Sequence, residues 1–158
     1  MYAASRAGVR VHLNVRGICA LRPGVPGISD NIEVVSVVDR FLEHSRIYFF
    51  LNGGDEDVYL ASADWMTRNL DKRAELMFPI EQPEHKAKVL DALRAMFRDT
   101  EKSRWLQSDG TYRRRIAGAD QPRCRVQETL YEQARRIAAM ARERTGVTFS
   151  PERGKLQQ

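Results

Sequence analysis

Four basic side chains stand where the chain is expected to leave a regular element: Arg16, His44, Arg68 and Arg73. Arg16 ends an alternating run and precedes Gly17, so its guanidinium could approach a phosphate closely and bind it through two N–H groups. His44 is expected at a helix C-terminus, where the helix dipole favours the imidazolium form. Such residue types indicate a site for phosphate groups.

Each of these residues also has a purely structural interpretation. His44 could cap the helix by bonding a carbonyl, and Arg16 could be an ordinary surface arginine. Arg68 and Arg73 lie in "SADWMTRNLDKR", a loop that Asp–Arg pairs of its own could hold together. The run from Arg113 to Arg115 is basic enough to contact a polyanion, although a charge run is more often a solvated face.

The elements that must position these residues follow from the pattern of apolar side chains. A period of two predicts a strand over 9–15, and Asp30 with Glu33 resembles a capping box opening a helix that runs to His44. Further expected elements are a helix end before Gly8, a hairpin over 46–61, a strand ending at 79, a helix over 83–99, a small hairpin around 109–110 and an inward-facing helix over 126–145. We therefore expect one α/β domain around a mixed sheet over residues 1–145, followed by a polar tail over 146–158.

Composition narrows the class of protein. The chain has 158 residues and a net charge of +5, which suits a polyanionic partner as well as an ordinary solvated exterior. No apolar run has the length of a membrane span, and the N-terminus lacks a signal-peptide core. Cys19 and Cys124 stand outside metal-ligand spacing, so we expect reduced thiols in the cytoplasm and no metal site. The chain opens within the expected first helix, as a piece of a longer protein would.

Two long blocks carry a more specific resemblance. "VRGICALRPGVPGISDNIEVVSVVDRFLEHSRIYFFLNGG" and "VYLASADWMTRNLDKRAELMFPI" closely resemble the C-terminal domain of the long bacterial polyphosphate kinase, over roughly residues 1–140. The resemblance implies a phospholipase-D-like fold, the second of two such domains in the family. The HxKxxxxD pattern of phospholipase D enzymes is not intact, because Arg46 replaces the lysine and Leu51 the aspartate.

The resemblance also implies an activity: reversible, magnesium-dependent transfer of the terminal phosphate of ATP onto polyphosphate. Arg16 matches the family's nucleotide-phosphate arginine, His44 its second active-site histidine and Arg73 an arginine near the phosphate path; we add Arg68 as a phosphate-binding candidate. The histidine that becomes phosphorylated belongs to the family's preceding domain, so this chain alone should not make polyphosphate. Partners implied are ATP or ADP, polyphosphate and the preceding domains of a homo-oligomeric enzyme, with no nucleic acid.

Two alternatives stay open. The chain could be a phospholipase-D-like module that binds nucleotide or polyanion without chemistry. It could also bind nucleic acid, although the aromatic residues near the arginine run, Trp105 and Tyr112, are too few for a base-stacking platform.

Overall fold

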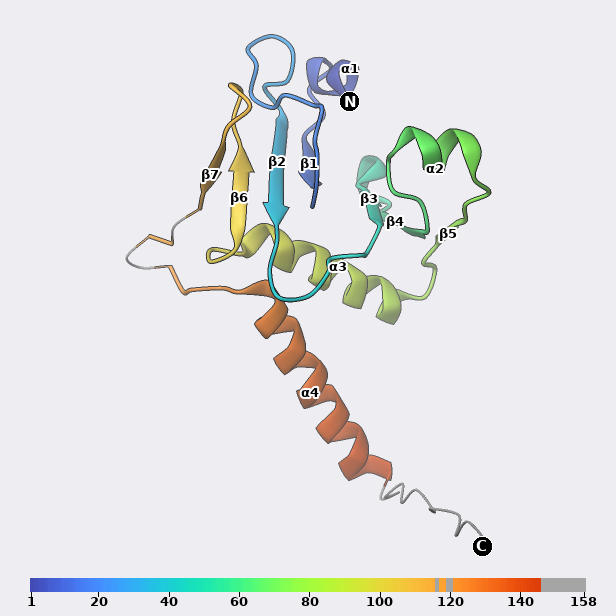
Figure 1. The fold of residues 1–158 in the computed structure, drawn as a ribbon. Coiled ribbons are helices and arrows are strands. Elements are labelled where there is room, and N and C mark those ends of the chain that lie inside the picture. The colour runs from blue at the N-terminus through green and yellow to red at the C-terminus, as the bar shows by residue number, and fades with distance from the viewer. Residues whose placement is uncertain (116, 119–120, 146–158) are drawn as a thin grey trace, which may run out of the picture.

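The computed structural model describes residues 1–115, 117–118 and 121–145, and Figure 1 shows their arrangement. The helices are α1 (Tyr2–Arg6), α2 (Thr67–Lys72), α3 (Pro83–Arg98) and α4 (Val126–Thr145), with a 3₁₀ turn η1 (Asn52–Gly54). The strands are β1 (Val11–Asn14), β2 (Ile32–Val37), β3 (Ile47–Phe50), β4 (Asp57–Ala61), β5 (Met77–Pro79), β6 (Ser103–Leu106) and β7 (Tyr112–Arg114). The predicted polar tail over 146–158, and the Gly146 that should end the last helix, lie outside the described residues.

The larger sheet is mixed and has the strand order β1-β2-β6-β7. β1 runs parallel to β2, whereas β2–β6 and β6–β7 are antiparallel. Both faces of β2 are covered, which suits its run of β-branched residues. On one face Val35 and Val37 pack with α3 and α4, and on the other Ile32 and Val34 pack with Leu106 and the loop after β1.

The smaller sheet has the order β3-β4-β5 and is antiparallel throughout. It confirms the predicted hairpin over 46–61, with Asn52–Gly54 as its turn. Tyr48 on β3 stacks on Trp65, their ring centroids 5.9 Å apart. This contact ties the segment before α2 to the hairpin, so the loop after β4 is held against the sheet that precedes it.

The predicted helix from Asp30 to His44 is wrong. The chain instead forms β2 and then a loop from Val38 to Arg46. Asp30 does not cap a helix: its carboxylate accepts a hydrogen bond from the Gly27 N–H at 2.7 Å, within the loop before the strand. The valines and isoleucine of this run have stiff side chains that favour strands, and they are buried on both faces rather than on one helical stripe.

Helix α4 differs from expectation in where its side chains lie. Val126 is fully buried and Leu130 half-buried, as predicted, but Ile137 is 57% exposed and Met140 61% exposed. Figure 1 shows why: α4 starts beside the sheet and then extends away from the body of the domain. The inward position predicted for the later residues is therefore wrong.

Within the described part of the chain, no helix is long and apolar enough to cross a membrane.

Candidate phosphate site

Arg16 and the loop Val38–Arg46 meet at the end of the larger sheet. The Val15 N–H donates to the Val35 carbonyl at 2.8 Å, so the pairing of β1 with β2 continues almost to Arg16. The Arg16 guanidinium then donates through Nη1 to the Glu43 carbonyl. Parallel strands end at the same edge, and this places Arg16 next to the loop that carries His44.

His44 is exposed, and its ring faces the guanidinium of Arg46. Arg46 Nη1 lies 3.1 Å from Nδ1 of the ring and Nη2 lies 3.1 Å from Nε2, which brings the two groups face to face. The expectation of a helix C-terminus at His44 is wrong, and with it the expected influence of a helix dipole. An arginine, rather than a helix end, sets the orientation of this ring.

Asp64 holds Arg46 in place from the far side. The Arg46 Nε–H donates to Asp64 Oδ1 at 3.0 Å, and both side chains are largely buried. This hydrogen bond is the main reason that the pKa of Asp64 lies below its usual value, and the positive charge of Arg46, then of Arg16 and His44, lowers it further. The same pair raises the pKa of Arg46.

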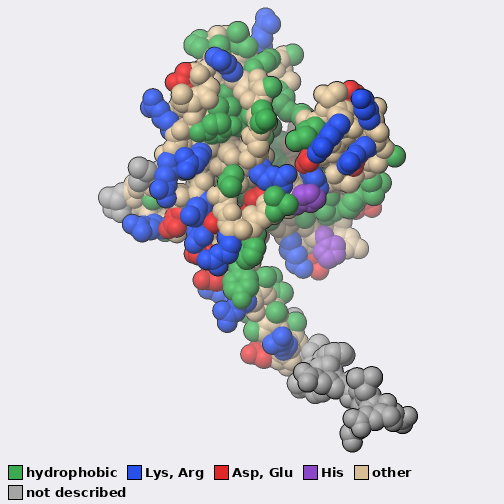
Figure 2. All heavy atoms as spheres, viewed as in Figure 1, with side chains coloured by type: hydrophobic (Ala, Val, Ile, Leu, Met, Phe, Trp, Pro, Cys, Tyr) green, Lys and Arg blue, Asp and Glu red, His purple; other side chains and the backbone are tan. Residues whose placement is uncertain are grey.

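We call Arg16, His44, Arg46 and Asp64 the phosphate-site cluster. It contains two guanidinium groups and an imidazole against one carboxylate, so its balance is positive. Figure 2 shows lysine and arginine side chains on both sides of a hollow between the larger sheet and α2, with a histidine at its rim. A pocket of about 220 Å³ lies beside Arg16, lined by residues 37–43 from the end of β2 into the loop. Asp39 and Glu43 are among its lining residues, so the positive charge that suits an anion lies in the cluster itself.

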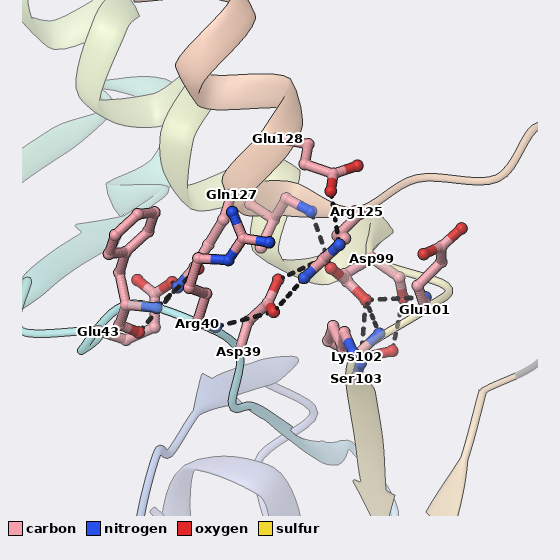
Figure 3. Close-up of polar contacts among 12 residues, drawn as sticks. Asp39, Arg40, Glu43, Asp99, Glu101, Lys102, Ser103, Arg125, Gln127 and Glu128 are labelled. Atoms are coloured by element: carbon pink, nitrogen blue, oxygen red, sulfur yellow. Dashed lines mark hydrogen bonds and ion pairs between the residues drawn. The ribbon is translucent and has the colours of Figure 1, made fainter.

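Arg125, directly before α4, and Gln127, in its first turn, hold the loop in place (Figure 3). Arg125 binds Asp39 through two hydrogen bonds, Nε to Oδ2 at 2.8 Å and Nη2 to Oδ1 at 2.7 Å. Gln127 accepts from the Phe41 N–H at 3.0 Å and donates to the Phe41 carbonyl at 2.8 Å and to Glu43 Oε1 at 2.7 Å. We call Asp39, Arg125 and Gln127 the brace, because they fix both the start and the middle of the loop.

Asp99 anchors the brace itself. It is fully buried, and its Oδ1 accepts backbone N–H groups from Glu101, Lys102 and Ser103 at 2.6–2.9 Å. Its Oδ2 accepts the Val126 N–H at 2.8 Å, at the first residue of α4. Four backbone donors thus satisfy one buried carboxylate, and α4 begins at a defined place.

Arg68 and Arg73 lie farther along, on α2 and directly after it. Arg68 Nε donates to Asn69 Oδ1 at 3.3 Å, and the buried Asn69 donates to Glu75, which also accepts from Ser62. Arg73 is exposed and makes no hydrogen bond or ion pair within the described residues. The structure therefore brings Arg16 to the loop of His44 through the Glu43 carbonyl, and among the described residues it shows no hydrogen bond or ion pair from Arg68 or Arg73 to Arg16 or His44.

The sequence reasoning did not select Arg46 and Asp64 as site residues. Arg46 stands at the lysine position of the HxK spacing, and that spacing could have identified it as the partner of His44. Asp64 had no comparable signal, because its role depends on pairing across 18 residues of sequence.

No group of three or more His, Cys, Asp or Glu side chains among the described residues gathers closely enough to hold a metal ion.

Comparisons with known proteins give the chain a family. A sequence profile described as "Polyphosphate kinase C-terminal domain 2" matches residues 1–127. Curated proteins named polyphosphate kinase from Rhodopirellula baltica and Pseudomonas aeruginosa are 51% and 52% identical to it, each over 84% of this chain. The chain spans only 16% and 19% of their lengths.

A solved structure agrees with the sequence matches. The crystal structure of polyphosphate kinase from Porphyromonas gingivalis superposes with a TM-score of 0.82 at 40% identity, over 88% of this chain and 21% of that one. The likeness confirms the expected fold class, a mixed α/β phospholipase-D-like domain. The chain therefore belongs to the family of polyphosphate kinase C-terminal domains.

Proposed function

We propose that this domain binds the phosphates of ATP and of polyphosphate in a polyphosphate kinase, and that the phosphate-site cluster is where it does so. The observation that carries the proposal is that Arg16 binds the carbonyl of Glu43, the residue before His44, while His44 contacts the Arg46–Asp64 pair, whose carboxylate feels the charge of Arg16. Phosphoryl transfer needs positioned positive charge more than covalent chemistry from the protein, and these residue types supply it.

Each residue has a distinct part in the proposal. Arg16 uses one Nη1–H on the Glu43 carbonyl, which leaves N–H groups of its fork for non-bridging phosphate oxygens. His44 faces the transferring group, where an imidazolium would offset developing charge or donate a proton to a phosphate oxygen. Arg46 orients the ring of His44. Arg73, exposed and without a partner in the described chain, guides the polyphosphate together with Arg68.

The rest of the reaction belongs to parts of the enzyme beyond this domain. The phosphorylated histidine and the magnesium site are proposed to lie in the preceding domains, in a homo-oligomeric cytoplasmic enzyme. Two free cysteines, Cys19 and Cys124, are compatible with that compartment. The 158-residue chain should therefore bind phosphate chains and should not elongate them.

A binding titration tests the proposal. Labelled polyphosphate and labelled ATP are titrated with the wild-type chain and with Arg16→Ala, and Arg142→Ala on α4 serves as a matched control that removes one exposed arginine. We expect Arg16→Ala to lower the affinity for both polyphosphate and ATP, because one fixed cation at the cluster is lost. The control variant should bind both with nearly the wild-type affinity.

Single-stranded DNA of matched charge separates this function from the nucleic-acid alternative. Binding of DNA in preference to polyphosphate, or an Arg16→Ala variant that binds polyphosphate as well as wild type, would contradict the proposal. Labelling of the chain by the γ-phosphate of ATP, followed by unaided elongation, would contradict the division of roles between domains.

A further inference from the structure

A second cavity lies on the other side of Arg16 from the loop Val38–Arg46. It has a volume of about 730 Å³ and runs between the loop that follows β1 and the β6–β7 hairpin. Arg16, Arg22 and Arg104 line it, with Leu21, Leu106 and Tyr112 among its apolar residues. We call it the arginine groove. Arg16 lines both this groove and the 220 Å³ pocket beside the loop, so the two cavities adjoin at one arginine.

The charge in the groove is uncompensated. No Asp or Glu is among the described residues that line it. The side chains of Arg22 and Arg104 make no hydrogen bond or ion pair with the described part of the chain, unlike Arg46 and Arg125. An arginine normally gains by pairing with an anion, and two guanidiniums in one groove leave that capacity open.

Strand register makes the position of Arg104 costly without a ligand. Arg104 on β6 is directly opposite Arg114 on β7, and like charges placed opposite each other in an antiparallel pair are destabilising. Arg114 is partly relieved because its Nη2 donates to the Glu101 carbonyl at 2.8 Å. An anion beside Arg104 would remove the remaining repulsion.

Arg22 reaches across the groove to the tip of the hairpin. Its Nη2 lies 4.0 Å from the place where a side chain on Gly110 would begin, and Gly110 has a φ of +87° that favours glycine. The arginines are therefore spread along the groove: Arg16 at the start of the loop after β1, Arg22 in its middle, and Arg104 on β6. A nucleotide concentrates its charge at one end, whereas a chain of phosphates carries charge along its whole length.

We propose that the arginine groove is a second subsite for polyphosphate, continuous with the phosphate-site cluster through Arg16. A chain bound at the cluster continues past Arg16 and lies along Arg22 and Arg104. This inference rests on the proposed function, since it extends the same substrate beyond the same site. It implies that long chains bind more tightly than short ones, because only long chains reach the groove.

Chain length provides the first test. Long-chain polyphosphate and tripolyphosphate are titrated at three salt concentrations with the wild-type chain, Arg104→Gln, Arg22→Gln and the control Arg142→Gln. We expect both groove variants to lose several-fold in affinity for the long chain and to show a shallower salt dependence, because fewer counterions are released; the direction of this effect carries over from nucleic acids. Tripolyphosphate affinity should stay close to wild type in both.

The two cysteines provide a second readout that does not depend on affinity. Cys19 lines the groove, whereas Cys124 lies beside Thr100 and is not among its lining residues. Long-chain polyphosphate should slow alkylation of Cys19 by a neutral thiol reagent, measured by peptide mass spectrometry, and should leave the rate at Cys124 unchanged. Tripolyphosphate should protect neither.

The outcomes separate this inference from the proposed function. If the groove variants bind long-chain polyphosphate as tightly as wild type, and Arg16→Ala binds it more weakly, the groove is not a polyphosphate subsite. The proposed role of the phosphate-site cluster would then be unaffected. Equal protection of Cys19 and Cys124 would also overturn the groove. Absence of any polyphosphate binding by the folded wild-type chain would defeat the proposed function itself.

Discussion

His44 offers a clear test at the scale of one residue. In a full-length polyphosphate kinase that carries this domain, we expect His44→Ala to lower the rate of polyphosphate synthesis by about 10²–10³, the usual cost of losing one preorganised charge-stabilising group. The thermal midpoint should change little, because the side chain is exposed and buries little apolar area. Near-wild-type synthesis by His44→Ala would return this histidine to a structural role.

Arg46 should behave differently from His44, because its partner is largely buried. Arg46→Ala leaves the Asp64 carboxylate without its main hydrogen bond, and we expect a loss of about 1–3 kcal/mol in the free energy of unfolding, measured with urea. The double variant Arg46→Ala/Asp64→Ala should recover part of this loss, since no unpaired charge remains. If the two single changes are instead additive, the pair is not coupled.

At the scale of single residues, the sequence indicates some residues of the candidate site and not others. The sequence indicates Arg16 and His44 because each is expected to precede or follow a change of element, and their role at a phosphate site stays a prediction. The helix end expected at His44 is absent from the loop 38–46, and Arg46 rather than a helix dipole orients the ring. Asp64 could not be assigned from spacing, since only the folded chain brings it to Arg46.

At the scale of elements, the loop Val38–Arg46 depends on the ion pair of the brace. The pKa of Asp39 falls from 3.8 to about 2, mainly because Arg125 hydrogen-bonds its carboxylate. A carboxylate whose pKa is lower in the folded state stabilises the fold above its unfolded pKa, and that contribution disappears as the pH falls towards the folded pKa. We therefore expect stability to drop between about pH 5 and pH 2, with Asp39 a main contributor.

Replacing the carboxylate checks this assignment. Asp39→Asn should be less stable than wild type at pH 7 by roughly 2 kcal/mol, because the stabilisation that accompanies the lowered pKa of the nearly buried Asp39 carboxylate is lost. The gap should narrow as the pH approaches 2, when the wild-type carboxyl is also protonated. Urea midpoints followed by circular dichroism at several pH values give both curves, and parallel curves would exclude Asp39 as the titrating group.

There is a physical reason why the sequence predicts a helix over residues 30–44 where the chain forms β2 and a loop. Residues 30–44 satisfied a helical start signal and a broad apolar face, and both signals are local. Burial of β2 on both faces removes the alternation that marks a half-exposed strand, so only the β-branched composition remained to indicate it. Strands with one covered face, and the hairpin around Asp109 and Gly110, were predicted correctly because their patterns are complete within a few residues.

At the scale of the whole molecule, α4 contains two parts with different energetic roles. Val126 is fully buried in the core with Val35 and Ala95, whereas Ile137 is mostly exposed on the same helix. We expect Val126→Ala to cost about 1–3 kcal/mol of unfolding free energy and Ile137→Ala to cost less than about 0.5 kcal/mol. Equal losses in urea denaturation would mean that the outer turns of α4 pack against something in solution.

The fold class of the whole chain came from resemblance over long blocks rather than from periodicity. The pattern of apolar residues alone predicts an α/β domain with one mixed sheet, and the larger sheet is mixed as expected. That pattern gives no reason for β3, β4 and β5 to form a second sheet. That separation follows from long-range pairing, because β2 is joined to β6 across the intervening hairpin and α3.

The loop Val38–Arg46 also has a consequence for sequence evolution. Most surface loops accept insertions and deletions, since their ends are fixed and their middles are free. This loop is fixed at Asp39, at Phe41 and Glu43, and at Arg46, by partners at the start of α4 and in the segment after β4. Gaining or losing one residue would shift His44 out of register with Arg16. Its length should therefore be invariant in an insertion–deletion library selected for function, whereas the turn at Asn52–Gly54 should tolerate both.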